Sequence, residues 1–270
     1  MSTSLRTETV KTLREFTDLV ESVMNQGNAT PWYRGCGRSS YTLMPTLYRR
    51  PAETDPSALF RLEASIICRF KQRCVPYLPR SLTSDWEALF LMQHFGVPTR
   101  LLDWTESPFI ALYFAITSSP SAMGQDGPLF SADAAVWILD PVAWNRHVLQ
   151  HLSYAEGVLS VGDPPLTGYA PGPEGPTHKE AVALFGTHNS PRIVAQRGVF
   201  TIFGHNTRPM EEVYESEGLP DGALVKVNLP TQSLADLNQS ISAVGITDSV
   251  VWPELDGLAK EIRRQFGYEV

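Results

Sequence analysis

Apolar residues recur three or four positions apart in several segments of the chain, which predicts amphipathic helices. The longest such segments cover residues 8–25, 56–75, 84–95 and about 253–266. Ser84 and Glu87 match a capping box at the start of the third helix, and Gly96 marks its end. In the last helix the apolar face is expected to point inward; it consists of Leu255, Leu258, Ile262 and Phe266.

Two further helices are predicted from local signals. Ser107 followed by Pro108 is typical of a helix start, and residues 143–152 form a shorter helical pattern. Strands are predicted for the apolar runs "AAVWILD" (134–140), "RIVAQRGVFTIFG" (192–204) and "ALVKVNL" (223–229), and "WYRGCGRSSYTL" (32–43) predicts strand, tight turn and strand. Helical patterns dominate the first half of the chain and strand patterns the second, without regular βαβ alternation. This order favours an α+β fold.

The length of 270 residues, 43% of them hydrophobic, suits one domain over residues 1–270 with a helical lead-in at about 1–27. Residues 157–176 contain five glycines and five prolines. This composition predicts a long exposed loop, an insertion at about 157–178, which we expect a protease to cut first.

The charge and cysteine content exclude several classes of protein. A net charge of −7 argues against a broad nucleic-acid-binding face, although a local basic cleft remains compatible with it. The three cysteines, Cys36, Cys68 and Cys74, do not match a disulfide framework or a zinc site. The N-terminus lacks an apolar signal core, and no run approaches the roughly 18 apolar residues of a membrane span. We therefore expect a cytoplasmic protein outside the membrane.

Common catalytic motifs are missing from the chain. It has no P-loop, no G-x-G-x-x-G, no G-x-S-x-G and no H-E-x-x-H. His147 and His151 have a spacing that metals use, but no carboxylate or cysteine ligand lies near them in the sequence. We interpret them as part of a solvated helix face and expect no metal site.

Three polar clusters remain as candidate chemistry. Arg34 lies at a strand end beside Gly35, so it either forks onto a ligand phosphate or carboxylate, or pairs with a carboxylate to close the turn. The stretch "QHFGVPTRLLDWTESPFIALYFA" (93–115) combines polar residues with an apolar helix. Its Gln93, His94, Thr99, Arg100 and Asp103 form either a structural network or a binding site. Gln196, in the third cluster, either pairs across the sheet or joins the site.

In this order, the blocks resemble the FRG-domain family, which takes its name from an aromatic-Arg-Gly motif. That motif is Tyr33-Arg34-Gly35 here. The resemblance also covers "MQHFGVPTRLLDWTESPFIALYFA", "RIVAQRGVFTIFG" and "GITDSVVWPELDGLAKEI", and it spans most of residues 30–266.

The order of the blocks is similar to that of ADP-ribosyltransferases. This resemblance implies a split, twisted β-sheet core with several flanking helices, which binds NAD as a substrate and modifies a macromolecular acceptor, either protein or nucleic acid. By the same resemblance Arg34, Asp103 and Gln196 are catalytic. The residues implied to bind NAD are Tyr33, Arg34, Gly35, His94, Thr99 and Arg100.

One departure from that pattern leaves two readings. Gln196 is neutral where the transferases place a glutamate, and a neutral amide does not offset positive charge as a carboxylate does. Either another carboxylate serves, from Asp103, Glu106 or Glu180, or the chain is a non-catalytic module that binds a ligand or a protein in the same cleft. The family resemblance further suggests a toxin or an anti-phage defence effector, with an antitoxin or a defence-system partner.

Overall fold

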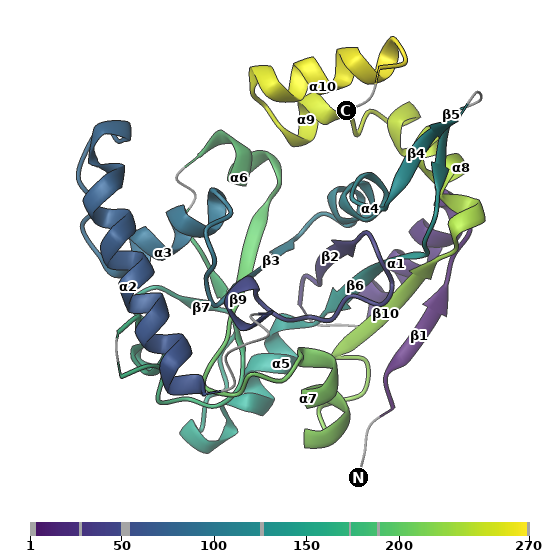
Figure 1. The fold of residues 1–270 in the computed structure, drawn as a ribbon. Coiled ribbons are helices and arrows are strands. Elements are labelled where there is room, and N and C mark those ends of the chain that lie inside the picture. Colours follow the sequence, from purple (N-terminus) through teal and green to yellow (C-terminus); the bar gives the residue numbers. More distant parts are fainter. Residues whose placement is uncertain are drawn as a thin grey trace.

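The computed structural model describes residues 4–26, 29–49, 55–124, 127–172, 174–187 and 190–268 (Figure 1). Its strands are β1 (Arg6–Thr9), β2 (Trp32–Cys36), β3 (Leu101–Thr105), β4 (Ser121–Gly124), β5 (Gly127–Phe130), β6 (Ala134–Leu139), β7 (Leu159–Ser160), β8 (Val182–Phe185), β9 (Gly198–Ile202) and β10 (Leu224–Leu229). Its α-helices are α1 (Leu13–Gln26), α2 (Pro56–Cys74), α3 (Asp85–His94), α4 (Pro108–Thr117), α5 (Pro141–Val148), α6 (Pro191–Ala195), α7 (Met210–Glu217), α8 (Leu234–Ala243), α9 (Asp248–Val251) and α10 (Leu255–Gln265). Five short 3-10 helices are η1 (Thr46–Arg49), η2 (Val75–Tyr77), η3 (Gln150–Leu152), η4 (Pro164–Tyr169) and η5 (Thr231–Ser233).

Eight strands form one mixed sheet in the order β1-β10-β6-β2-β3-β9-β8-β7, and the predicted α+β class is confirmed. The outermost pairs, β1 with β10 and β7 with β8, are parallel, and the other pairs are antiparallel. Within the sheet, β2 forms five residue pairs with β6, and β3 forms five with β9. The central strands β2 and β3 share the fewest residue pairs, the single pair Tyr33–Thr105.

Helices cover both faces of this sheet (Figure 1). The six residues of β6 are all buried, and they alternate between the two cores. Val136 and Ile138 pack with α4 and α8, while Trp137 and Leu139 pack on the opposite face with α5 and α7. A third core lies between β8, β9 and the helices α2 and α3. No helix in the described residues is both long enough and apolar enough to cross a membrane.

The helices with local capping signals form where they were predicted. Ser84 Oγ accepts a hydrogen bond from the Glu87 amide at 3.1 Å, and Gly96 ends α3 with φ +72°. Ser107 caps α4 in the same way, through the Ile110 amide. These signals act within three or four residues, so they need no support from distant parts of the chain.

Three local predictions need correction. The first helix begins at Leu13 and not near residue 8, because Arg6–Thr9 pair with β10 as β1. No second strand follows the turn after β2; the chain continues irregularly to η1 instead. The start of "RIVAQRGVFTIFG" is helix α6, because Ser190 caps it and Pro191 occupies its first turn; only Gly198–Ile202 form a strand.

The Gly/Pro-rich segment is more closely packed than predicted. It holds β7 and η4 and is otherwise irregular in its described residues. Leu159, Leu166 and Tyr169 are almost fully buried. The prediction that this segment is exposed throughout is therefore wrong, because these apolar side chains fill the core beneath α2 and α3.

Helix α10 is oriented opposite to the prediction. Its apolar residues are exposed, from 45% for Leu258 to 83% for Leu255. Its other face is held by polar contacts and by one close approach. Arg264 Nε lies 2.8 Å from Asp248 Oδ2, and a Cβ on Gly257 would lie 1.9 Å from the Trp252 carbonyl oxygen. The contacts of this polar face, and not its apolar stripe, determine how α10 sits on α9.

Candidate functional site

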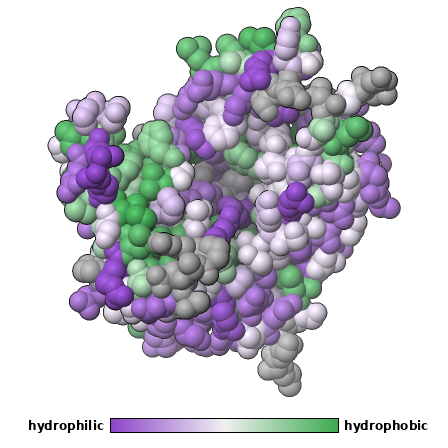
Figure 2. Space-filling model, viewed as in Figure 1, coloured by the Kyte–Doolittle hydropathy of each residue, from purple (hydrophilic) through white to green (hydrophobic). Residues whose placement is uncertain are grey.

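A cavity of about 250 Å³ opens where β2 meets β3, beside the single pair Tyr33–Thr105. Figure 2 shows the surface hollowed in this region. Its walls come from β2, α3, β3, α4, α6 and β9, so segments far apart in the sequence meet there. The lining residues are Tyr33, Arg34, Gly35, Gln93, His94, Asp103, Trp104, Thr105, Phe114, Ser118, Arg192, Ile193, Gln196, Gly198 and Phe200.

Asp103 is the central residue of β3; it is exposed at the cavity wall but has protein on all sides, and a chain of hydrogen bonds orients its carboxylate. The Leu101 amide donates to Thr99 Oγ1 at 3.0 Å, so the Thr99 hydroxyl proton goes to Gln93 Oε1. Because Gln93 Oε1 accepts this proton, the orientation of the Gln93 side-chain amide is determined, and its Nε2 donates to Asp103 Oδ2 at 2.6 Å. The Leu101 amide, the Thr99 hydroxyl and the Gln93 amide thus act in series to orient the Asp103 carboxylate at the cavity wall.

The environment of Asp103 changes its acidity. Surrounding protein raises the pKa of Asp103 above its usual range, since the charged form loses solvation. The nearby Arg34, Gln93 and Arg192 side chains act in the opposite direction, but they do not cancel this effect. Asp103 therefore takes up a proton more readily than an ordinary aspartate does.

Two neighbouring residues of β2 bring polar groups without partners to the cavity. Arg34 Nη1 donates to the Asp103 carbonyl oxygen at 2.6 Å, whereas its buried Nε has no partner among the described residues. The buried hydroxyl of Tyr33 also lacks a partner there, and burial raises the pKa of this phenol to about 12. Both groups are donors whose hydrogen-bonding capacity the described residues leave unused.

Arg192 faces these residues from α6. Its guanidinium carbon lies 3.7 Å from the centre of the Trp252 ring. His94 lines the cavity as well, and its pKa is lowered by burial and by the charge of Arg192. His94 is consequently neutral at pH 7, and its ring packs edge-on against Phe95.

Gln196 lies at the end of α6 and not within a strand, as the sequence pattern had predicted. Its side-chain Nε2 donates to the Val251 carbonyl oxygen at 3.2 Å. Its backbone carbonyl oxygen accepts a hydrogen bond from Thr105 Oγ1 at 2.6 Å. The next residue, Arg197, has φ +48°, which turns the chain sharply into β9. Gln196 therefore reaches the cavity from a turn that β3 and α9 both hold in place.

Two residues predicted to bind a ligand lie outside the cavity. Arg100 is completely buried, and its guanidinium donates to Glu63 Oε2 at 2.7 Å and to the carbonyls of Phe203 and Tyr169. Thr99 is also fully buried and acts through Gln93. Sequence spacing did not separate them from Asp103, because Thr99, Arg100 and Asp103 all lie in one short stretch.

Gly35 lines the cavity, but its lack of a side chain serves packing. A Cβ at this position would lie 2.0 Å from the Ala111 carbonyl oxygen and 2.5 Å from the Ala115 amide nitrogen. The glycine of the aromatic-Arg-Gly motif therefore allows α4 to lie directly on β2. This contact places Phe114 of α4 at the cavity wall.

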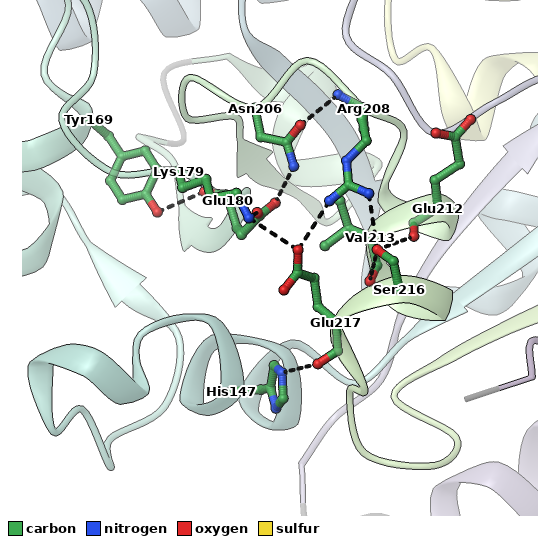
Figure 3. A network of polar contacts seen from close by, with 10 residues as sticks. All are labelled: His147, Tyr169, Lys179, Glu180, Asn206, Arg208, Glu212, Val213, Ser216 and Glu217. Atoms are coloured by element: carbon green, nitrogen blue, oxygen red, sulfur yellow. Dashed lines mark hydrogen bonds and ion pairs between the residues drawn. The ribbon is translucent and has the colours of Figure 1, made fainter. Parts of the chain in front are cut away.

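The other two candidate carboxylates are engaged elsewhere. Glu106 lies 3.6 Å from Arg197 Nη2. Glu180 pairs with Lys179 Nζ at 3.0 Å and accepts a bond from Asn206 Nδ2 at 2.8 Å. Figure 3 shows Glu180 within a network that reaches Glu217. Neither lines the cavity, so Asp103 is the one carboxylate among the described residues that line it.

The sequence did not single out Arg192. It belongs to the block "RIVAQRGVF", from which only Gln196 was selected. Its orientation depends on Trp252, which lies 60 positions further along the chain. Gln93 was predicted to belong to a polar network or a binding site, without a catalytic or NAD-binding role of its own. For Arg192 and Gln93, the residue type alone was a weak indication of a binding site. The contacts that place them there are made with distant residues, which the sequence does not reveal.

Comparisons with known proteins identify part of the chain. No curated protein and no solved structure matches this chain. The sequence model of the FRG domain family matches residues 29–123, which contain β2, α3, β3 and α4 and thus one side of the cavity, including Tyr33, Arg34 and Asp103. The blocks around Gln196 and α10 lie beyond the matched residues. The chain therefore carries an FRG domain over residues 29–123.

Proposed function

We propose that the cleft between β2 and β3 binds NAD and transfers its ADP-ribose unit to a macromolecular acceptor. One observation carries this proposal: Arg34, Asp103 and Gln196 line a single cavity at the point where the two halves of the sheet are joined by one residue pair. A split sheet of ADP-ribosyltransferase type would hold its dinucleotide at such a junction. The unpartnered donors of Arg34 and Tyr33 suit the oxygen-rich phosphates and riboses of that ligand.

The transfer breaks the bond between the ribose C1′ and nicotinamide, whose nitrogen keeps the electron pair, and forms a bond from C1′ to an acceptor atom. The proton of that acceptor atom must go to a base. Asp103 suits this role because its raised pKa brings it closer to neutral pH, where general bases work best. In its ionised form it also offsets positive charge that develops on the sugar.

Gln196 has a positioning role in this proposal. Its Nε2 is occupied by the Val251 carbonyl, which fixes the side-chain amide. Its Oε1 has no hydrogen bond within the described part of the chain and is suited to accept one from a ribose hydroxyl. Thr105 holds the backbone of Gln196 from β3, so the amide stays at a set distance from Asp103.

The test is nicotinamide release from NAD in the presence of cell extract, with label followed on protein and on nucleic acid separately. We expect Asp103→Asn to lower the rate by roughly 10²–10⁴-fold, the usual contribution of a general base. Glu106→Gln and Glu180→Gln are expected to leave the rate unchanged, because neither side chain lines the cavity. If either of these variants loses activity while Asp103→Asn keeps it, the catalytic assignment is wrong.

A second candidate function is a non-catalytic module that binds a ligand or protein in the same cleft. It is favoured by the neutral Gln196, whose amide is already tied to Val251. The two functions differ in one measurement. A module binds NAD or ADP-ribose without releasing nicotinamide in any extract, whereas the enzyme releases it.

In the cell, this proposal fits a cytoplasmic toxin or anti-phage effector that an antitoxin or defence partner restrains. Induced expression of the wild-type chain should then slow growth or reduce phage yield, and Asp103→Asn at equal abundance should not. Equal effects of the two proteins would argue against a role for transferase chemistry in the phenotype.

A further inference from the structure

We propose that Arg192 is a second anion-binding residue of the cleft, held in place by Trp252, and that it and Arg34 together grip the phosphates of one ligand. The inference deepens the proposed function and rests on it for the identity of that ligand, NAD. Its physical basis is independent of catalysis, because it concerns only which groups bind the phosphates.

The first observation is how Arg192 is presented. Trp252 is half-buried, and its ring packs edge-on against Phe114 with 5.9 Å between ring centres. The chain around it is also held, since Gly257 of α10 lies directly against the Trp252 carbonyl. Arg192 lies over this fixed ring at 3.7 Å. A guanidinium stacked on an aromatic face keeps its in-plane N–H groups available for acceptors at its edge.

The second observation is that donors are left unmatched. The Nε atoms of Arg34 and Arg192 and the hydroxyl of Tyr33 are buried, and none has a hydrogen-bond partner within the described residues. All three residues line the same cavity, from β2 and from α6. Buried polar groups are nearly always satisfied in folded proteins, so an acceptor with several oxygens is expected between them.

The third observation is the charge of the cavity. Neither Arg34 nor Arg192 forms an ion pair within the described residues, although both lie near Asp103. Burial lowers the pKa of Arg192, with Asp103 and Glu254 opposing it, but a guanidinium stays charged in proteins. His94 is kept neutral. Two guanidinium groups therefore lie at one cavity, with Asp103 beside them, which suits a ligand that carries several negatively charged oxygens, such as a pyrophosphate.

The experiment measures binding of ADP-ribose, inorganic pyrophosphate and adenosine by titration calorimetry. Arg192→Ala should weaken ADP-ribose and pyrophosphate by roughly ten- to a hundredfold, as expected for loss of charge-assisted hydrogen bonds, and leave adenosine binding unchanged. Arg192→Lys should rescue poorly, because lysine lacks the planar fork. Arg197→Ala is the matched control: it removes an arginine five residues away that does not line the cavity.

The role of Trp252 is tested by a double-mutant cycle. Trp252→Leu should weaken ADP-ribose several-fold in the presence of Arg192 and have little further effect in Arg192→Ala, since it acts through that arginine. Lys260→Ala controls for the other cation beside this ring, at 5.0 Å. Thermal unfolding of each variant checks that it is folded.

The outcomes separate this inference from the proposed function. Unchanged ADP-ribose affinity in folded Arg192→Ala overturns the inference, even if nicotinamide is released. Arg192-dependent binding without nicotinamide release supports the inference and argues against the transferase. A wild-type protein that binds neither ADP-ribose nor pyrophosphate overturns the inference as well.

Discussion

The arginines of this chain differ in role because their guanidinium groups meet different partners. Arg34 and Arg192 reach the cavity with an unmatched Nε each. Arg100 lies close to Asp103 in the sequence, but its donors are used by Glu63 and by two backbone carbonyls. A residue type and its spacing therefore do not determine whether an arginine binds a ligand or supports the fold.

Removing Arg100 should destabilise the protein without a direct effect on the cleft. Arg100→Met leaves the Glu63 carboxylate, 1% exposed, buried without its cation, and losing one partner of a buried ion pair typically costs about 3–5 kcal/mol. Urea unfolding measures this loss. The control is Arg61→Met on α2, the helix that carries Glu63; its exposed pair with Asp55 is expected to contribute under about 1 kcal/mol. If the Arg100→Met variant is as stable as the wild type but binds ADP-ribose more weakly, Arg100 has a role in ligand binding and this prediction is wrong.

Asp103 should make stability depend on pH. Because its pKa is raised in the folded state, the fold binds this proton more tightly than the unfolded chain does. The ionised carboxylate therefore destabilises the fold at neutral pH, and this effect disappears as the pH falls below the unfolded pKa of about 3.9. We expect Asp103→Asn to have the higher Tm at pH 7 and the difference to shrink towards pH 4. A difference that grows as the pH falls would mean that the pKa is lowered.

At the scale of elements, α4 and β2 meet through backbone contact, and α10 meets α9 through its polar face. Both arrangements depend on a glycine. Gly35 admits the backbone of α4, and Gly257 admits the Trp252 carbonyl. In both places the close approach positions aromatic residues, Phe114 and Trp252, beside the cavity or beside Arg192.

Gly35→Ala should therefore disturb the β2–α4 contact. Its Cβ would meet the Ala111 carbonyl at 2.0 Å, and backbone atoms cannot move aside as a flexible side chain can. We expect a loss of about 3 kcal/mol or more in unfolding free energy, at the upper end for overpacking. Gly172→Ala is the control, because a Cβ there meets no atom of the described residues within 4 Å. Equal stability of the two variants would contradict this packing role.

The apolar stripe of α10 should contribute little to stability. Leu255 and Phe266 are 83% and 69% exposed, so Leu255→Ser and Phe266→Ser should each change the unfolding free energy by no more than about 0.5 kcal/mol. Gly257→Val, on the opposite face, should destabilise strongly because its side chain would enter the Trp252 carbonyl. Large losses in both serine variants would show that the stripe is packed in solution.

At the scale of the whole molecule, the sheet consists of two firmly paired halves with a weak junction. Six residue pairs join β6 to β10, whereas one joins β2 to β3. The cavity lies at that junction, so a bound ligand would contact both halves. This arrangement leaves backbone groups near the site less tied to their neighbours than those elsewhere in the sheet.

Hydrogen exchange should reveal this difference. Peptides covering residues 32–36 and 101–105 are expected to exchange faster than the peptide covering 134–139, which is paired on both edges. ADP-ribose should slow exchange in the first two and leave the third unchanged. Uniform protection across the three peptides would contradict a weak junction.

The sequence alone determined the features that depend on near neighbours. It predicted the starts of α3 and α4 because a capping serine acts on an amide three positions away. It predicted the buried strand β6 from its unbroken apolar run. The block order that resembles ADP-ribosyltransferases also grouped Arg34, Arg100, Asp103 and Gln196 in one site; three of them line one cavity, whereas Arg100 is buried in the core.

Tertiary structure decided the features that depend on contacts between distant segments. The apolar pattern of α10 is the same whether that face points inward or outward, and the polar contacts with α9 and Trp252 decide between them. Arg192 stacks on Trp252 at the cavity, whereas Arg100 is held in the core by Glu63 and by the carbonyls of Phe203 and Tyr169. Local sequence fixes backbone preference through short-range hydrogen bonds, whereas the burial and charge environment of a side chain depend on neighbours that the fold brings together.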